Sequence, residues 1–332
     1  MPHVHDGHAR HLRRRTLLAA ALPLAAAGMA RAQAWPSRPI RLIVAFGTGS
    51  GNDLIARELA EPMSRTLGQS VVVENRPGGG GSLGTDVVAK AAPDGYTIGL
   101  GTSSQLVMNP ALYKTLPFDV DRDLRGIGLI SRTPLLLAAS MAMPATLREV
   151  MAQAQAQPGR LTYASAGQGS ITHIVAESFA RATQTRLLHV PYKGNGPALV
   201  DLSGGHVNLL FDGLLACVPL ARQGKLRMLA LSSDRRSPQA PELPTFAEAG
   251  LSGYEAFTWN SLFAPARTPP EVVARLNDAL NQALALPSIA ERLARSAAEP
   301  LGPATPDQAD AYARAQRERW VPFVRGLNIE LS

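Results

Sequence analysis

The sequence lacks most of the chemistry that supports disulfides and familiar catalytic sites. It has 332 residues and one cysteine, so no disulfide can form within the chain. That residue, Cys217, stands in the apolar run Leu214–Val218, which favours burial over nucleophilic chemistry. No H-E-x-x-H helix and no cysteine pair occurs, and Gly49-Ser50-Gly51 does not fit the G-x-S-x-G turn of hydrolases. These absences weigh against metalloproteases, zinc modules and hydrolases.

The chain also lacks a run of basic residues of the kind that binds nucleic acid. The formal net charge is +7, with 33 Lys and Arg against 26 Asp and Glu. Five of the basic residues and one of the acids precede Trp35, so the remainder carries +3. Only His173, His189 and His206 follow Trp35, too scattered along the chain to suggest a metal site. We therefore expect no nucleic-acid partner.

Residues 1–34 have the layout of an export signal peptide. Arg13-Arg14-Arg15 precede an apolar run of about 14 residues, and A-x-A sites end at Ala32 and Ala34. Such a run is shorter than the roughly 20 residues that cross a bilayer, and no later run suggests a span. A twin-arginine leader and a plain basic Sec signal both fit. We expect a periplasmic protein, cleaved near Ala32 or Ala34.

The rest of the chain alternates strand patterns with glycine turns and helices. Strands are expected at 40–45, 71–73, 96–100, 161–164, 187–190, 207–211 and 228–231, and helices from about 52, at 85–90 and from 171. Thr268–Glu271 and Thr305–Gln308 fit capping boxes with proline in the first turn, and Pro322 should kink or end the last helix. Strand–helix–strand repetition implies an α/β fold with a parallel sheet. About 300 residues favours two lobes.

The stretch Gly78–Gly84 raises the question of a dinucleotide site. From Gly79 it follows G-x-G-x-x-G between a predicted strand and a predicted helix. The acid expected about 20 residues later, at the end of the next strand, is missing, because Asp94 lies at that strand's start. The glycines fit better a backbone that approaches a ligand or a neighbouring loop without side chains between them. We expect no cofactor.

Turns rich in glycine and serine open a predicted helix three times, at 47–53, 78–85 and 165–172. A helix N-terminus offers free N–H groups and partial positive charge, which suit a carboxylate or phosphate. In an open α/β sheet such turns lie beyond the carboxyl ends of the strands. Ordinary helix capping explains any one of them, but three in an exported chain favour a binding protein.

Over essentially its whole mature length the chain resembles the substrate-binding receptors of tripartite tricarboxylate transporters (TTT), the TctC-like Bug (Bordetella uptake gene) family. The resemblance lies in the order of several short motifs. They are Glu74–Gly79, Ala92–Thr97, Asn109–Tyr113, Leu116–Asp119, His189–Gly194, Pro244–Gly250 and Trp259.

The resemblance implies a two-lobed type II periplasmic-binding-protein (Venus flytrap) fold, with two Rossmann-like α/β lobes joined by crossing strands. Lobe one would hold residues 35–139 and 257–332, and lobe two residues 140–256. It also implies a monomeric receptor, not an enzyme, with no cofactor or metal, that captures a small carboxylate between the lobes for membrane subunits of a TTT transporter. The ligand would be a di- or tricarboxylate, an aromatic acid or an amino acid. A sensor for a membrane kinase and a hydrolase using the same cleft are the alternatives.

Carried onto this sequence, the resemblance assigns the ligand to loops from both lobes. The implied ligand-binding residues are Phe46, Gly49, Ser50, Asn52, Asp53, Thr102, Ser103, Gln105, Asn109, Ser165, Gly167, Ser170, Thr172, Tyr192 and Asp212.

Several of these residues have a second explanation. Asp53 could serve only as a helix cap, Asn109 only to shape the turn before Pro110, and Tyr192 only as hinge packing. Asp212 would repel a carboxylate yet could accept a hydrogen bond from an ammonium or hydroxyl group. The first loop, Ala45–Gly51, also lacks the family's usual prolines, which leaves the identity of the ligand open.

Overall fold

The computed structural model describes residues 35–295, 297–329 and 331. The predicted signal peptide and its cleavage sites lie outside the described residues. The chain divides into a unit that ends at Ser37 and a unit that begins at Arg38, and the second holds the fold. Within the described part, no helix is long and apolar enough to cross a membrane.

Within the residues that the structure describes, ten strands form one mixed sheet, in the order β2-β1-β3-β9-β4-β7-β5-β6, with β8 and β10 also paired to β4. The strands are β1 Ile40–Val44, β2 Val71–Asn75, β3 Thr97–Thr102, β4 Leu124–Ala139, β5 Thr162–Ser165, β6 Leu188–Pro191, β7 Leu209–Gly213, β8 Arg227–Leu231, β9 Phe257–Pro265 and β10 Glu299–Pro300. The strands expected from periodicity are all present, within two residues of the expected bounds. Parallel pairing of β1 with β2 and β3, and of β5 with β6 and β7, confirms the expected parallel sheet.

Helices cover this sheet and connect its strands. They are α1 Gly51–Leu67, α2 Ser82–Ala89, α3 Asn109–Leu112, α4 Val120–Asp123, α5 Leu147–Ala156, α6 Ile171–Ala182, α7 Asn195–Ser203, α8 Leu214–Arg222, α9 Pro270–Leu284, α10 Pro287–Arg295 and α11 Pro306–Gly326. A 3-10 turn at Gly79–Gly81 precedes α2, and a π-helical segment at Ser104–Met108 follows β3.

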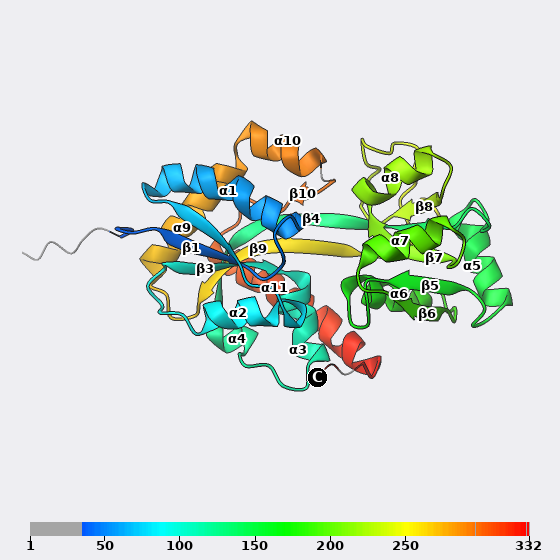
Figure 1. Ribbon diagram of the computed structural model, residues 1–332, viewed down its shortest axis with the longest axis horizontal. Coiled ribbons are helices and arrows are strands. Elements are labelled where there is room, and N and C mark those ends of the chain that lie inside the picture. Colours follow the sequence, from blue (N-terminus) through cyan, green and yellow to red (C-terminus); the bar gives the residue numbers. More distant parts are fainter. Residues whose placement is uncertain (1–34, 296, 330, 332) are drawn as a thin grey trace, which may run out of the picture. The chain divides into compact units, whose positions relative to one another are not determined.

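The long strand β4 belongs to two parts of the sheet. Residues Leu124–Pro134 pair with β9, whereas Leu135–Ala139 pair with β7 and β8 (Figure 1). We call the part with β1, β2, β3 and β9 lobe one, and the part with β5, β6, β7 and β8 lobe two. Ser232 holds the crossing point, because its hydroxyl accepts from Leu135 N–H and donates to Ala256 carbonyl. The residue boundaries expected for the two lobes, 35–139 with 257–332 and 140–256, stay a prediction.

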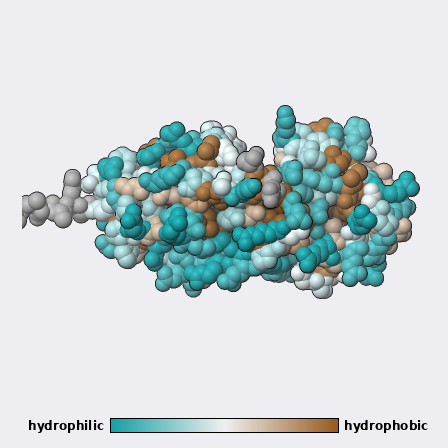
Figure 2. Space-filling view, turned by 90° about the horizontal axis from the view of Figure 1, so that it is seen from below, coloured by the Kyte–Doolittle hydropathy of each residue, from teal (hydrophilic) through white to brown (hydrophobic). Residues whose placement is uncertain are grey.

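Each lobe has its own buried apolar cluster. In lobe two the rings of Phe179, Phe211, Phe246 and Tyr254 contact one another, with centroids 4.7–6.2 Å apart. In lobe one Trp259 of β9 packs edge-on against Tyr312 of α11. On the face seen in Figure 2 the apolar areas are small and separated by hydrophilic ones. The oligomeric state is not tested by this view, and the expected monomer stays a prediction.

The glycine motif Gly78–Gly84 packs α2 directly against the end of β1. A Cβ at Gly84 would lie 2.6 Å from Ala45 Cβ and 2.9 Å from the Arg76 carbonyl oxygen. Gly78, Gly79, Gly80 and Gly81 all have positive φ, so the turn also depends on glycine for its backbone conformation. The motif thus serves a close approach of helix and strand.

Substituting Gly84 with alanine should therefore destabilise the protein by about 1–3 kcal/mol, because backbone on both sides must move apart. Gly326→Ala is the matched control, since a Cβ there meets nothing within 4 Å. Chemical denaturation of both variants tests the prediction. Equal stability of the two would show that the contact at Gly84 relaxes without cost.

The sequence signals for helix starts and ends were right in one case and wrong in two. Thr305 and Gln308 form the predicted capping box of α11. The box predicted at Thr268 is wrong: α9 starts at Pro270 with Pro269 as its cap, and the Thr268 hydroxyl donates to the Pro265 carbonyl instead. Pro322 was expected to kink or end the last helix; an end there is wrong, because α11 continues to Gly326, and the kink stays a prediction.

Candidate functional site

The predicted ligand-binding residues lie mainly at the carboxyl ends of parallel strands, or just after them. Phe46–Asp53 follow β1, and Thr102–Asn109 begin at the last residue of β3 in lobe one. In lobe two Ser165–Thr172 begin at the last residue of β5, Tyr192 directly follows β6, and Asp212 lies near the end of β7. Ligands of open α/β sheets bind at this edge.

In the first loop, Asp53 organises the backbone. Its side chain is 1% exposed and accepts hydrogen bonds from Gly49 N–H at 2.8 Å and from Asn75 Nδ2 at 2.9 Å. Arg57 contacts both carboxylate oxygens, at 3.1 and 3.0 Å. The hydrogen bond from Arg57, with those from Gly49 and Asn75, outweighs burial and lowers the pKa of Asp53 from 3.8 to about 2. The carboxylate thus already has four donor contacts within the loop and its neighbours.

The other members of the first loop are fixed around this carboxylate. Ser50 caps α1 by accepting from Asp53 N–H, and the Phe46 carbonyl accepts from Asn75 Nδ2. The Asn52 side chain accepts from Asn260 Nδ2 of β9 at 2.8 Å. The structure therefore brings the predicted residues of this loop together, and adds Asn75 and Asn260, which the sequence did not single out as site residues.

The second predicted wall is buried, and two of its amides face the glycine turn. Gln105 Nε2 donates to Thr85 Oγ1 at 3.0 Å, and Asn109 Nδ2 donates to the Gly80 carbonyl and Ser82 Oγ. A Cβ at Gly81 would meet the Gln105 side chain at 2.6 Å. These two amides hold the start of α2, while Thr102 and Ser103 lie buried at the end of β3.

The stretch Gly80–Gly84 fits the G-x-S-x-G spacing of hydrolases, so the expected absence of that motif is wrong. Ser82 has ordinary right-handed helical backbone angles, φ −64° and ψ −34°. Its hydroxyl accepts from Asn109. The strained, exposed serine of a nucleophile elbow is therefore not formed here.

In lobe two, polar side chains link the ends of β5, β6 and β7. Ser170 caps α6, and Thr172 Oγ1 accepts from Ala166 N–H at 2.9 Å and lies 3.5 Å from Asn195 Oδ1. Asn195 Nδ2 in turn donates to Asp212 Oδ1 at 2.9 Å. The predicted Ser170, Thr172 and Asp212 are therefore joined through Asn195, which the sequence missed.

The two ionisable groups predicted at the strand ends differ in their environment. Burial raises the pKa of Asp212 in spite of hydrogen bonds from Gly213 N–H and Asn195. The Tyr192 hydroxyl donates to Asp201 at 2.6 Å, and burial together with this bond raises the pKa of Tyr192 to about 12. The phenol of Tyr192 is thus engaged by α7.

The loop Ser165–Ser170 is held by two histidines. The Ser165 hydroxyl lies 2.7 Å from His189 Nε2, and Gly169 N–H donates to His173 Nδ1 at 3.0 Å. Gly167 N–H and carbonyl both contact the Ser165 hydroxyl at 3.1 Å. Within the described residues no group of three or more His, Cys, Asp or Glu could hold a metal ion.

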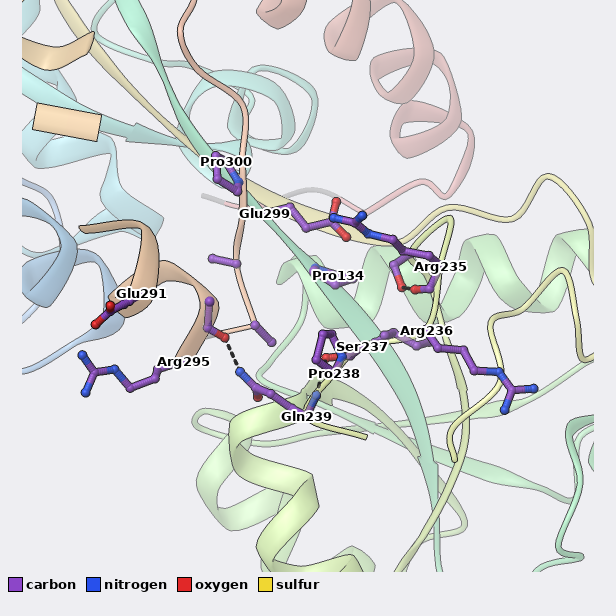
Figure 3. Close-up of a pocket in the computed structure, with 15 residues that line it drawn as sticks. Pro134, Arg235, Arg236, Ser237, Pro238, Gln239, Glu291, Arg295, Glu299 and Pro300 are labelled. Carbon is purple, nitrogen blue, oxygen red and sulfur yellow. Dashed lines mark hydrogen bonds between the residues drawn. The ribbon is translucent and has the colours of Figure 1, made fainter. Parts of the chain in front are cut away.

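A separate hollow of about 590 Å³ lies beside β4, at Pro134. It is lined by the segment after β8, by the end of α10 and by residues 297–300, and none of the predicted ligand-binding residues lines it. Figure 3 shows Gln239 pointing toward α10, where its amide donates to the Ala294 carbonyl. This hollow is therefore distinct from the loops at the strand ends.

Two α/β lobes that share long strands, each with polar loops at the ends of its parallel strands, define the class of two-lobed solute-binding receptors. More specifically, the chain belongs to the family described as "Tripartite tricarboxylate transporter family receptor" (TctC), whose family model matches residues 55–329. It is 38% identical over 314 residues to BugT of Bordetella pertussis, across 93% of this chain and 96% of BugT.

Solved structures agree with this assignment. A protein of R. palustris solved with adipate is 35% identical, with a TM-score of 0.78 over 90% of this chain and 100% of that one. MatC of Rhodopseudomonas palustris, with bound malate, is 33% identical, with a TM-score of 0.74 over 87% and 100%. These findings confirm the predicted fold class and the resemblance to the Bug family. The chain is a solute receptor of the TctC family.

Proposed function

We propose that this protein is a periplasmic receptor that captures a small carboxylate between its two lobes and delivers it to membrane subunits of a TTT transporter. The observation that carries the proposal is the chemistry of the strand ends. The first loop and Ser165–Ser170 present hydroxyls, amides and the starts of α1 and α6, while Asp53 is already neutralised by Arg57. A carboxylate would be held by N–H and O–H donors there.

Within this proposal the residues divide into two roles. Gly49, Ser50, Asn52, Thr102 and Ser103 in lobe one, with Gly167, Ser170 and Thr172 in lobe two, are the groups we expect to contact the ligand. Asp53, Gln105, Asn109 and Tyr192 support those loops through the bonds described above. Ligand binding then shifts an open–closed equilibrium, because the closed form offers contacts from both lobes.

The ligand class is supported by similarity to proteins whose structures hold adipate and malate. We propose a small di- or tricarboxylate, with aromatic acids and amino acids as the other members to test. Asp212 would accept from a hydroxyl or ammonium group if the ligand carries one. A hydrolase is disfavoured because Ser165, the serine beside His189, is fully buried.

A thermal-shift panel of malate, adipate, citrate, benzoate and aspartate, each beside its neutral amide, tests this function. We expect at least one acid, and not its amide, to raise the melting temperature. At one hundred times its Kd a ligand stabilises the native state by about 2.7 kcal/mol. A panel in which only nucleotides stabilise the protein would restore the dinucleotide interpretation.

Two controls test where the acid binds and which membrane partner receives it. Ala294→Trp would fill the exposed hollow beside β4 and should leave the thermal shift unchanged. Loss of the shift in that variant would place the ligand there and overturn the assignment to the strand ends. Co-purification with TTT membrane subunits, rather than with a kinase, would separate a transport receptor from a sensor.

A further inference from the structure

Three aromatic rings are stacked directly beneath the Ser165–Ser170 loop. They come from Tyr163 on β5, His189 on β6 and His173 on α6, which are neighbours in lobe two (Figure 1). The two imidazoles are 3.9 Å apart between centroids, with planes 6° apart, and Tyr163 lies 4.9 Å from His189 on a nearly parallel plane. Two imidazolium ions at this spacing would repel each other strongly, so the stack is stable only when at least one ring is neutral.

Each imidazole bonds one end of the loop. His189 Nε2 forms a hydrogen bond with the Ser165 hydroxyl at the loop's first residue. His173 Nδ1 accepts from Gly169 N–H near its last residue. A nitrogen that accepts carries no proton, so His173 must be neutral with its proton on Nε2. His173 is only 5% exposed, which leaves little water to replace a lost bond.

We propose that His173 and His189 are positioning residues that hold loop 165–170 in its binding conformation only while His173 is neutral. The inference rests on the proposed function, because it assumes that this loop contacts the ligand. Protonation of His173 at Nδ1 removes the acceptor of Gly169 N–H and places a charge against His189. The loop then loses its C-terminal anchor, and ligand affinity falls in acid although the fold persists.

The groups around the stack set the pH range in which His173 is protonated. From β5 the Tyr163 phenol faces the stack and is bonded to Glu177 of α6, and from β6 His189 faces it. The loop itself, Ser165–Ser170, contributes only uncharged groups. Burial, with the charge of His189, lowers the pKa of His173 from 6.5 to about 4, and burial lowers the pKa of His189. Neutral pH therefore keeps the loop anchored, and the anchor is lost as the pH falls through about 4.

Amide exchange of Gly169, followed by NMR from pH 7.5 to pH 4, tests the anchor without any ligand. His173→Leu removes the acceptor, and we expect Gly169 to exchange about tenfold faster at pH 7.5 after correction for intrinsic rates. His173→Gln offers an acceptor that does not titrate, so protection should be kept and should no longer depend on pH between 6.5 and 4. A Gly169 amide that exchanges alike in wild type and His173→Leu overturns the proposal.

Binding of malate and adipate, measured by calorimetry, tests the consequence. If either binds at pH 7.5, its affinity at pH 4 should fall about twofold more in wild type than in His173→Gln, because about half of His173 is protonated at that pH. The comparison cancels the titration of the ligand itself, which is common to both proteins. An equal fall in both overturns the role in binding. If neither acid binds at pH 7.5, the ligand class proposed above fails for these probes, whereas the Gly169 result still decides the anchor.

Discussion

Truncating Trp259 to alanine is expected to lower the free energy of unfolding by about 3–5 kcal/mol, the largest effect of any substitution considered for this protein. Trp259 is 2% exposed and lies on β9 opposite Arg132 of β4. Its ring meets Tyr312 of α11 at 5.3 Å in an edge-on contact. Truncation removes that contact and opens a cavity between the long strands and α11.

Urea unfolding of Trp259→Ala and of a surface control measures this loss. Leu188→Ala is the control, because Leu188 is also on a strand but more than half exposed, and a change there should stay within about 0.5 kcal/mol. Trp259→Phe should recover part of the loss, since a phenyl ring refills part of the cavity. A Trp259→Ala protein within 1 kcal/mol of wild type would mean that α11 closes onto β9 without cost.

Periodicity predicted the regular elements because they depend on local patterns. The apolar stripe Ile171, Ile174, Val175 and Phe179 marked α6, and all except Ile171 are fully buried. The same local logic found the cap at Thr305 and failed at Thr268. There two consecutive prolines moved the first helical turn one residue onward, and the threonine hydroxyl turned back to Pro265. Local sequence patterns therefore predicted the presence of helices and strands better than the residues at which they begin and end.

The partners of the site residues were beyond local reasoning. Arg57 lies one helical turn after Asp53 and can be read from sequence, but Asn75 reaches the same carboxylate from β2, 22 residues away. His189 lies beside Tyr163 only because β5 and β6 pair in parallel at that register. The resemblance supplied loop residues such as Gln105 and Asn109, yet their amides face the glycine turn. The strand register and the direction of each side chain decide which residues become partners. Neither can be predicted from the spacing of residues along the sequence.

Replacing Asp53 with alanine should cost about 2–3 kcal/mol of stability at pH 7 and loosen the first loop. The substitution leaves Gly49 N–H and Asn75 Nδ2 without their acceptor in a buried place and frees Arg57. Arg57 is about half exposed, so solvent already screens its share and the hydrogen bonds carry most of the loss. Asp53→Asn keeps an acceptor for Gly49 and should lose less. Chemical denaturation of both variants at pH 7 tests this order.

The contributions of Asp53 and of the histidine stack to stability are lost in different pH ranges. Because the pKa of Asp53 falls from 3.8 to about 2 in the folded protein, its stabilisation is complete above pH 3.8 and is lost as the pH falls toward 2. About half of it should be gone by pH 3. The penalty of Asp53→Ala should therefore stay constant from pH 7 to pH 4.5 and then shrink. The histidine stack loses its stabilisation at higher pH, between pH 6.5 and about 4. His173→Gln should therefore make the free energy of unfolding nearly independent of pH in that range and leave its fall below pH 4 unchanged. A penalty for Asp53→Ala that already shrinks above pH 5 would mean that its carboxylate is not held by these donors.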